Sequence, residues 1–458
     1  MKTRIISSIT ILLFCMQITS AQELKRRGLL GIMMQSVNDS IAQELDLKTT
    51  SGLYLSMVMP NSTFANLGVK PGDVLTVLNG EQVNTPQDVL NITSGLYEGA
   101  EISITYQSKN GQKKASTSLL GRPKESFKNA TVTYGQVNYT GNRLRSILVS
   151  PVGVENPPVV YFLQGYTCGS VETVSDDNPM KKLMTDWLNA GFAVYRVEKP
   201  GVGDSQSSRP CSVISFDEEL KAFKEGYKDL LANKSIDTDN IFLFGHSMGG
   251  VVAPLLEKVH VPKGTIVYGT VGDNWFDYML DLYTIQPKHF GVSDAQIKED
   301  NKINLEFNKD FLIRKLSGKE LIANEAYVDF FRNGELDFEN DQYIGRHFDF
   351  WQNLADVDIP GAWAKVETNV LALYGEFDIQ AINVQGVEKI KAIVNKNKGK
   401  ATVMVIPKAD HGFVNFDSMQ HNATTLGNGT YMQHARDNYS QTLGKETSRW
   451  MRSKLENS

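Results

Sequence analysis

The sequence predicts a large α/β domain with a mostly parallel sheet and an inserted helical cap, preceded by a small β-rich domain. Three observations lead to this fold class. The chain has 458 residues, too many for one ordinary domain. From about residue 128 onward, apolar strand-like runs alternate with amphipathic helical segments, as in a parallel sheet covered by helices. Residues 26–120 instead show short strands and glycine-containing turns.

The amino-acid composition indicates a globular protein and argues against some functions. Apolar residues make up 41% of the chain, which is enough to build cores. The net charge of -5 and the pI near 5.9 show no basic excess, so we expect no nucleic-acid binding. The sequence contains no zinc-type cysteine and histidine cluster and no phosphate-binding glycine loop, so we expect no metal and no cofactor.

Residues 1–21 have the pattern of a signal peptide. Two basic residues precede an apolar stretch over residues 5–14, and residues 19–21 resemble a cleavage site. The stretch is too short to span a bilayer comfortably, and no other segment is predicted to be transmembrane. Cys15 would suit a lipoprotein, but Phe14 is bulky where such a site needs a small residue. We therefore expect an exported protein, either periplasmic or secreted.

The elements of the β-rich domain follow in order. Strands are expected at 27–32, at 52–58, after the turn of 66–75, and around 102–106. Asn79 and Gly80 predict a hairpin turn. Thr85 is expected to cap a short helix over 86–92.

This segment resembles a PDZ domain of the bacterial type, similar to those of the high-temperature-requirement proteases. Gly68 with the Pro-Gly-Asp of 71–73 and the Asn79–Gly80 turn are the most specific matches. The resemblance implies that a peptide adds to a sheet edge and that a backbone loop receives its terminal carboxylate. That loop matches Gly28, Leu29, Leu30, Gly31 and Ile32. The alternative is a domain that only packs or dimerises. Residues 121–127 are expected to be a linker.

Residues 245–249, which read Gly-His-Ser-Met-Gly, are the strongest chemical signal in the chain. They lie between the apolar run of 241–244 and the helix-like segment of 251–256. Strand, sharp turn and helix are the setting of a G-x-S-x-G nucleophile, and the glycines avoid Cβ clashes in the strained turn. Ser247 is therefore the predicted nucleophile.

Two later strands supply partners for this serine. The strand-like run of 369–374 leads to Asp378, and that of 401–406 leads to His411. Asp204 is the alternative acid, but it precedes the nucleophile in the chain. The other histidines lack the position of His411 in a loop directly after a strand that follows the acid. Asp410 is expected to have a supporting or solvent-facing role.

The order Ser247, Asp378, His411 is that of α/β-hydrolases. Residues 128–458 resemble such a domain, near its esterase and acyl-peptidase branches. The resemblance implies that the backbone amides of Tyr166 and Met248 bind the oxyanion. Gln164 stands where the family usually has histidine, which leaves the shape of this loop open.

The remaining segments of the large domain fit the same pattern. Strands are expected at 159–163, 192–197 and 264–268, helices from 179 to about 191 and from 216, and a final helix within 439–455. Residues 271–366 break the pattern and are rich in aromatic residues. They are expected to form a helical cap whose aromatic residues either line an acyl or aromatic pocket or form the core of the cap.

Cys168 and Cys211 remain after the signal peptide is removed. A lone pair in an exported protein is a disulfide candidate, and both residues fall in loops at the carboxyl ends of neighbouring strands. Two buried free thiols are the alternative.

Together these residues favour an exported serine hydrolase that cleaves carboxylic esters through an acyl-enzyme. A serine peptidase that receives peptides from the PDZ-like domain is the first alternative. A non-catalytic interaction protein is the second, although it has no reason to retain all three catalytic residues. Small-ester hydrolysis is expected to survive removal of residues 22–121.

Overall fold

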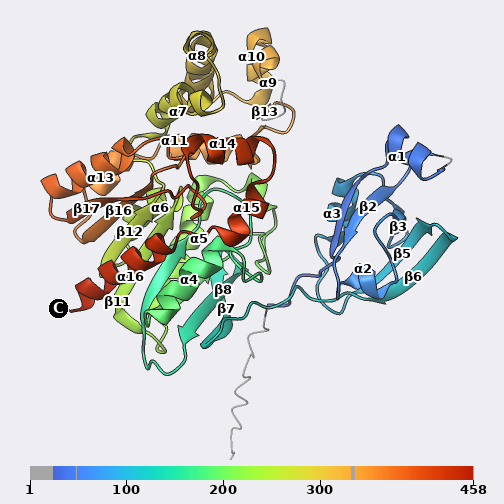
Figure 1. Cartoon of the computed structure of the whole chain (residues 1–458), viewed down its shortest axis with the longest axis horizontal. Coiled ribbons are helices and arrows are strands. Elements are labelled where there is room, and N and C mark those ends of the chain that lie inside the picture. The colour runs from blue at the N-terminus through green and yellow to red at the C-terminus, as the bar shows by residue number, and fades with distance from the viewer. Residues whose placement is uncertain (1–23, 48, 332–335, 457–458) are drawn as a thin grey trace, which may run out of the picture.

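The computed structural model describes residues 24–47, 49–331 and 336–456. The predicted signal peptide and Cys15 lie outside the described residues. A small β-rich body precedes a larger body in which helices flank a sheet (Figure 1). Within the described ranges, no helix is long and apolar enough to cross a membrane.

The small domain is built on one antiparallel sheet. Its strand order is β1-β2-β3-β5-β6, and β4 pairs with β3. Its elements are β1 (Ile32–Ser36), α1 (Asp39–Glu44), β2 (Leu53–Val58), α2 (Thr63–Asn66), β3 (Val74–Leu78), β4 (Glu81–Gln82), α3 (Pro86–Thr93), β5 (Glu101–Ser108) and β6 (Gly111–Ser118). Thr85 caps α3 through a capping box, and β1 lies at the edge of the sheet.

The large domain contains an eight-stranded sheet in the order β17-β16-β12-β11-β9-β10-β8-β7. Six neighbouring strands from β17 to β10 are parallel, and the β7–β8 hairpin adds two antiparallel strands at one edge. These strands are β7 (Ala130–Tyr139), β8 (Asn142–Pro151), β9 (Pro158–Leu163), β10 (Ala193–Val197), β11 (Asp237–His246), β12 (Gly264–Tyr268), β16 (Asn369–Gly375) and β17 (Lys400–Ile406). The mostly parallel α/β architecture is confirmed.

Helices bury both faces of this sheet. In β9, Tyr161 packs with α5 and α6, whereas Phe162 faces the opposite core with α4 and α16. The helices outside the inserted segment are α4 (Pro179–Asn189), α5 (Phe216–Leu231), α6 (Gly249–Leu256), α13 (Gln385–Lys396), α14 (Met419–Gly427), α15 (Tyr431–Asp437) and α16 (Gln441–Leu455). Since successive side chains of a strand alternate in direction, a strand covered on both faces is apolar throughout.

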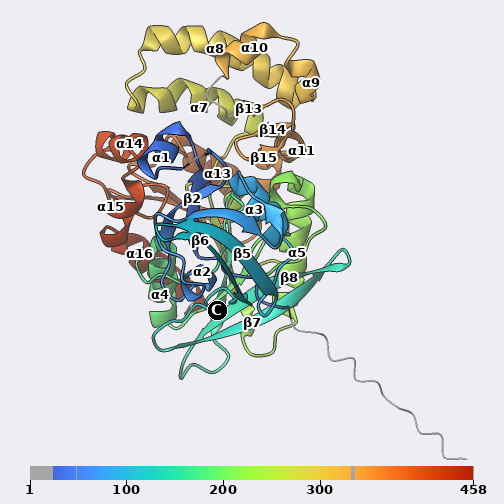
Figure 2. The ribbon, with the colours of Figure 1, turned by 90° about the vertical axis from the view of Figure 1, so that its right-hand side faces the viewer.

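The segment between β12 and β16 stands apart from this sheet, with α7, α8 and α10 at the top of the molecule (Figure 2). It contains α7 (Trp275–His289), α8 (Asp294–Asn308), α9 (Gly318–Leu321), α10 (Glu325–Phe330), α11 (Phe348–Ala355) and α12 (Ile359–Trp363), with the short strands β13 (Leu336–Asp337), β14 (Gln342–Tyr343) and β15 (Arg346–His347). The expected helical cap therefore also holds a small antiparallel sheet. Strands of two residues leave no alternation that a sequence pattern can reveal.

The chain before the small domain docks against the large domain. The Nη1 atom of Arg26 lies 2.6 Å from Asp204, and its Nη2 atom lies 3.0 Å from Glu172. Asp204 is fully buried and also pairs with Arg145. Removing residues 22–121 would take away Arg26 and leave these buried acids short of a partner. The deletion therefore carries a cost in stability, and the survival of small-ester hydrolysis after it stays a prediction.

The predicted linker is likewise anchored. Glu125 is 4% exposed and pairs with the buried Arg196. Gly121 forms a β-bridge with Gly28. Residues 121–127 therefore do not behave as a free tether between the domains.

Replacing Arg26 with methionine should destabilise the large domain. Two buried carboxylates lose a cation, and breaking a buried ion pair costs about 3 kcal/mol. Urea unfolding measures this loss. Arg314→Met is the control, because it breaks an exposed pair with Asp310 and should cost less than about 1 kcal/mol. Equal effects of the two substitutions would contradict a structural role for Arg26.

Candidate active site

Ser247 occupies a strained turn between β11 and α6. Its φ of 55° lies in the left-handed region, which costs a residue other than glycine about 1–3 kcal/mol. The amide of Ser247 donates to the carbonyl of Tyr268 at 2.9 Å, and the Ser247 carbonyl accepts from Gly250 at 2.9 Å. The surrounding hydrogen bonds therefore hold the serine in this conformation.

The glycines around Ser247 permit close packing. A Cβ atom on Gly249 would lie 2.0 Å from the carbonyl oxygen of Leu163, at the end of β9. A Cβ atom on Gly245 would lie 2.5 Å from the carbonyl oxygen of Gly249. Larger residues at either position would force α6 away from the sheet.

His411 and Asp378 meet at the carboxyl ends of β17 and β16. The Nδ1 atom of His411 lies 2.8 Å from Oδ2 of Asp378, and Asp378 is fully buried. The carboxylate also accepts hydrogen bonds from the amides of Gln380 and Ala381 at 2.9 and 2.8 Å. With Nδ1–H directed at the carboxylate, Nε2 of His411 is left to accept a proton.

The surroundings of His411 favour its protonated form. Burial lowers its pKa, but the charge and hydrogen bond of Asp378, together with the charge of Asp410, outweigh burial, so the pKa is raised above 6.5. Asp378 therefore stabilises the imidazolium that forms when this histidine takes a proton.

The loop after β9 lies directly against Ser247. A Cβ atom on Gly165 would lie 3.0 Å from Cβ of Ser247. Tyr166 and Met248 line a cavity together with Ser247 and His411. The predicted nucleophile, base and oxyanion donors thus border one space, and Asp378 lies behind the histidine.

This cavity has a volume of about 340 Å³ and is mostly apolar. Aromatic and aliphatic side chains from the inserted segment and the loops form its wall: Tyr166, Met248, Val271, Trp275, Tyr278, Met279, Leu282, Phe290, Tyr343, Ile344, Trp351, Ile379 and Leu426. Among the described residues that line it, none is Asp, Glu, Lys or Arg. Other aromatic residues, including Phe307 and Phe311, form the core of the cap. The aromatic residues of the inserted segment therefore divide between the wall of this cavity and the core of the segment.

Comparison with known families divides the chain in the same way. Residues 28–119 match the family model of the PDZ domain, and residues 177–275 match that of serine aminopeptidase, S33.

The chain joins a PDZ domain to an α/β-hydrolase domain.

Curated relatives match short stretches. A probable periplasmic serine protease of Haemophilus influenzae is 33% identical over 81 residues, 18% of this chain and 17% of its own length. The periplasmic serine endoprotease DegP of Escherichia coli K12 is 40% identical over 60 residues, 13% of each chain. The chain thus spans less than a fifth of these relatives.

Solved structures resemble the chain more distantly. Est1E of Butyrivibrio proteoclasticus, solved with ferulic acid, has a TM-score of 0.41 and 15% identity, with 66% of this chain and 98% of its own covered. The acylaminoacyl peptidase of Pyrococcus horikoshii has a TM-score of 0.42 and 12% identity, with 76% and 55% covered.

Two polar residues beside the α/β-hydrolase site hold the chain around His411, and of these the sequence predicted a supporting or solvent-facing role only for Asp410. The Nε2 atom of His246 lies 2.8 Å from the carbonyl oxygen of His411, and burial lowers the pKa of His246 to about 3. A neutral His246 therefore donates to the backbone of His411. Asp410 accepts from the amides of Gly412 and Val414 at 2.9 Å and so shapes the loop that carries His411. In the sequence, His246 is only the variable position of the serine motif.

Cys168 and Cys211 form a disulfide with a Cα–Cα distance of 5.8 Å. Cys168 follows the loop that carries Tyr166, and Cys211 begins a short 3-10 helix before α5. The disulfide therefore ties the loop after β9 to the connection between β10 and α5.

The predicted carboxylate loop of the PDZ domain is partly engaged. The amides of Gly28 and Leu29 donate to the carbonyls of Leu96 and Leu120 at 3.2 and 2.7 Å. Leu30 lines a cleft that the PDZ domain shares with the α/β-hydrolase domain. Of the predicted loop Gly28–Ile32, the first two amides are thus used within the protein.

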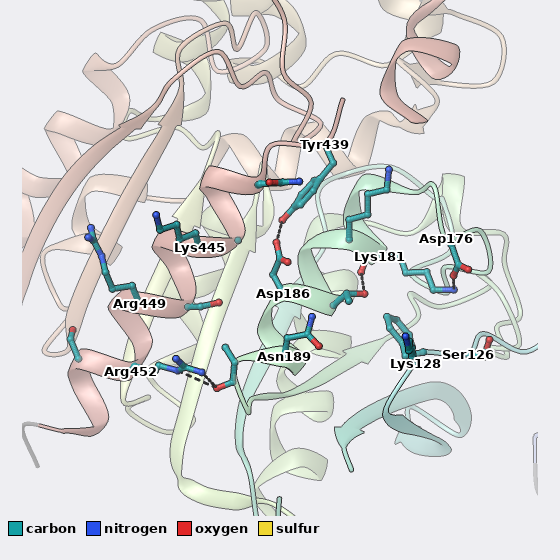
Figure 3. A pocket seen from close by; sticks show the side chains of 18 of the residues that line it. Ser126, Lys128, Asp176, Lys181, Asp186, Asn189, Tyr439, Lys445, Arg449 and Arg452 are labelled. Carbon is teal, nitrogen blue, oxygen red and sulfur yellow. Dashed lines mark hydrogen bonds and ion pairs between the residues drawn. The ribbon is translucent and has the colours of Figure 1, made fainter. Parts of the chain in front are cut away.

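A second groove lies between α4 and α16 (Figure 3). Basic side chains gather there, but Arg449 pairs with Glu446 and Arg452 donates to the carbonyl of Ala190. The groove shares no lining residue with the cavity at Ser247. We assign it no part in the chemistry. Within the described ranges, no cluster of three or more His, Cys, Asp or Glu residues is arranged to hold a metal ion.

The raised pKa of His411 can be measured by NMR in a Ser247→Ala background. We expect its imidazole to titrate above pH 6.5, and Asp378→Asn to lower that pKa, because the charge that opposes burial is gone. His289, in the inserted segment, is the internal control and should not respond. An unchanged pKa of His411 would contradict the ion pair.

Proposed function

We propose that the protein is an exported serine hydrolase that cleaves carboxylic esters. Ser247 is the nucleophile, His411 the general base, and Asp378 the carboxylate that orients the base. The hydrogen bond between His411 and Asp378, at the edge of the cavity that Ser247 lines, supports these roles. The predicted signal peptide, the disulfide and the periplasmic relatives of the PDZ domain support export.

The reaction follows from these groups. Ser247 Oγ attacks the ester carbonyl while Nε2 of His411 takes its proton, and Asp378 stabilises the imidazolium. The amides of Tyr166 and Met248 hold the oxyanion, which contributes about 3 kcal/mol per donor. His411 then returns the proton to the departing alkoxide. Water, activated by the same histidine, releases the acid and frees Ser247.

The mostly apolar cavity, which no described acidic side chain lines, is the observation that favours esters of apolar acids over the substrates of an aminopeptidase. An aminopeptidase must bind the free α-ammonium group of its substrate, and a buried cation needs a carboxylate partner. No acidic side chain is among the described residues that line the cavity. An uncharged acyl group therefore fits the site better.

The walls also fit an aromatic or aliphatic acyl group. The rings of Tyr166 and Trp275 lie 5.4 and 5.5 Å from that of Trp351. Nε1 of Trp351 donates to the carbonyl of Tyr343 at 2.7 Å, and the Tyr278 hydroxyl donates to that of Gln380 at 2.6 Å. Because these polar groups are satisfied within the protein, the wall offers the substrate mainly apolar surface.

A peptidase is the second candidate, and one observation favours it. The cleft that contains Leu30 of the PDZ domain also contains Asp337 and Gln342 of the inserted segment. Tyr343, the next residue, lines the cavity at Ser247. A peptide held by the PDZ domain would therefore end near the wall of the catalytic cavity. The third alternative is an interaction protein without catalytic activity, which would hydrolyse neither esters nor peptides.

Matched chromogenic substrates separate these functions. We expect the protein to hydrolyse esters of apolar acids, and Ser247→Ala to reduce kcat/KM at least about 10⁴-fold. Ser448→Ala, in the groove between α4 and α16, is the control and should leave turnover unchanged.

Three other results would contradict the proposed function or favour an alternative. Equal turnover of peptidyl amides would favour the peptidase. Preference for substrates with a free α-ammonium group would contradict the claim that the cavity binds an uncharged acyl group. Ester turnover that survives Ser247→Ala would exclude the catalytic roles given above.

A further inference from the structure

Three buried charged residues lie behind the loop that carries Tyr166. Lys199 follows β10, Glu219 lies on α5, and Arg346 belongs to β15 of the inserted segment. Each is at most 2% exposed. Glu219 lies 2.8 Å from Nζ of Lys199 and 2.9 Å from Nη2 of Arg346. One carboxylate thus joins two cations that come from distant parts of the chain.

Both cations donate to backbone carbonyls of the loop. Nζ of Lys199 donates to the carbonyl of Gly165 and, at 3.1 Å, to that of Thr167. Arg346 donates to the carbonyl of Tyr166 between them. Three consecutive carbonyl groups are therefore held by buried cations. The guanidinium of Arg346 also stacks 3.6 Å above the ring of Phe350, which fixes its plane.

The bond to Gly165 bears directly on the predicted oxyanion donor. The carbonyl of Gly165 and the amide N–H of Tyr166 belong to one planar trans peptide, so they point in opposite directions. When Lys199 holds the carbonyl on one side, the N–H of Tyr166 is turned to the other. Gly165 is packed against Ser247, which places this peptide beside the nucleophile.

The charge of Lys199 suits this task. Burial lowers its pKa to about 8, while the charge of Glu219 acts in the opposite direction. The group is therefore an ammonium at pH 7. Hydrogen bonds from a charged donor are about twice as strong as those between neutral groups.

We propose that Lys199 is a positioning residue that orients the Tyr166 amide toward the oxyanion, within a buried Lys199–Glu219–Arg346 network. This proposal rests on the proposed esterase function. It adds that the inserted segment contributes to the oxyanion loop through Arg346, besides covering the cavity. Lys199 does not touch the reacting atoms, so its removal should impair the transition state more than substrate binding.

Lys199→Met tests this role because it removes the ammonium group and keeps the stem. We expect kcat for the best apolar ester to fall about 10²-fold, with KM within about twofold, since loss of one oxyanion donor costs about 10²–10³ in kcat. Lys181→Met is the matched control. Lys181 is also a buried lysine that donates to a carbonyl, that of Val174, but it lies on α4. Its kcat should stay at the wild-type value.

Arg346→Met separates positioning from general support of the network. It removes a bond to the carbonyl of Tyr166, whose peptide partner is the N–H of Thr167 rather than that of Tyr166. We expect a smaller loss of kcat than in Lys199→Met. Equal losses in the two variants, or a Lys199→Met enzyme with wild-type kcat, would overturn the proposal.

A second variant and a crystal structure test the proposal even if Lys199→Met does not fold. If Lys199→Met fails to fold, Lys199→Gln takes its place, because it also removes the ammonium group, leaves Glu219 paired with Arg346 and should show a similar loss of kcat. A crystal structure of either variant shows the orientation of the Gly165–Tyr166 peptide independently of any activity measurement. An unchanged peptide orientation would overturn the proposal. Failure of the wild-type protein to hydrolyse esters would instead count against the proposed function.

Discussion

The close approach of α6 to the end of β9 is the constraint on which the site depends. Gly249 lies so near the carbonyl of Leu163 that no larger residue fits. This contact draws the chain into the left-handed turn at Ser247 and sets Ser247 against Gly165 in the loop after β9. This packing contact, together with the hydrogen bonds at Ser247, thus brings the predicted nucleophile beside the loop of the predicted oxyanion donor. The predicted base and acid follow the ends of two further strands, β17 and β16.

Much of this arrangement could be predicted from the sequence because the signals are local. Ser247, Asp378 and His411 each follow an apolar run that identifies a strand, buried for β11 and β16 and at the sheet edge for β17, and the chain order is informative in itself. The cap of α3 by Thr85 could be predicted for the same reason. These features depend on residues within a few positions of one another.

The buried charges were not predictable, because their partners are far apart in the chain. Glu219 lies 127 residues from Arg346, and Arg26 lies 178 residues from Asp204. In a sequence window, each of these residues looks like one charge on an exposed surface. Only the tertiary fold shows that they are desolvated and paired. The docking of the segment around Arg26 could not be predicted for the same reason, whereas the small sheet of the cap was missed because each of its strands has only two residues.

The most direct test of the central claim is the site of covalent modification. Incubation with a fluorophosphonate, followed by peptide mass spectrometry, identifies the residue that acts as nucleophile. The account predicts one adduct, on the peptide that contains Ser247, and none after Asp378 or His411 is replaced. An adduct on another serine, or ester turnover that persists after complete labelling of Ser247, would contradict it.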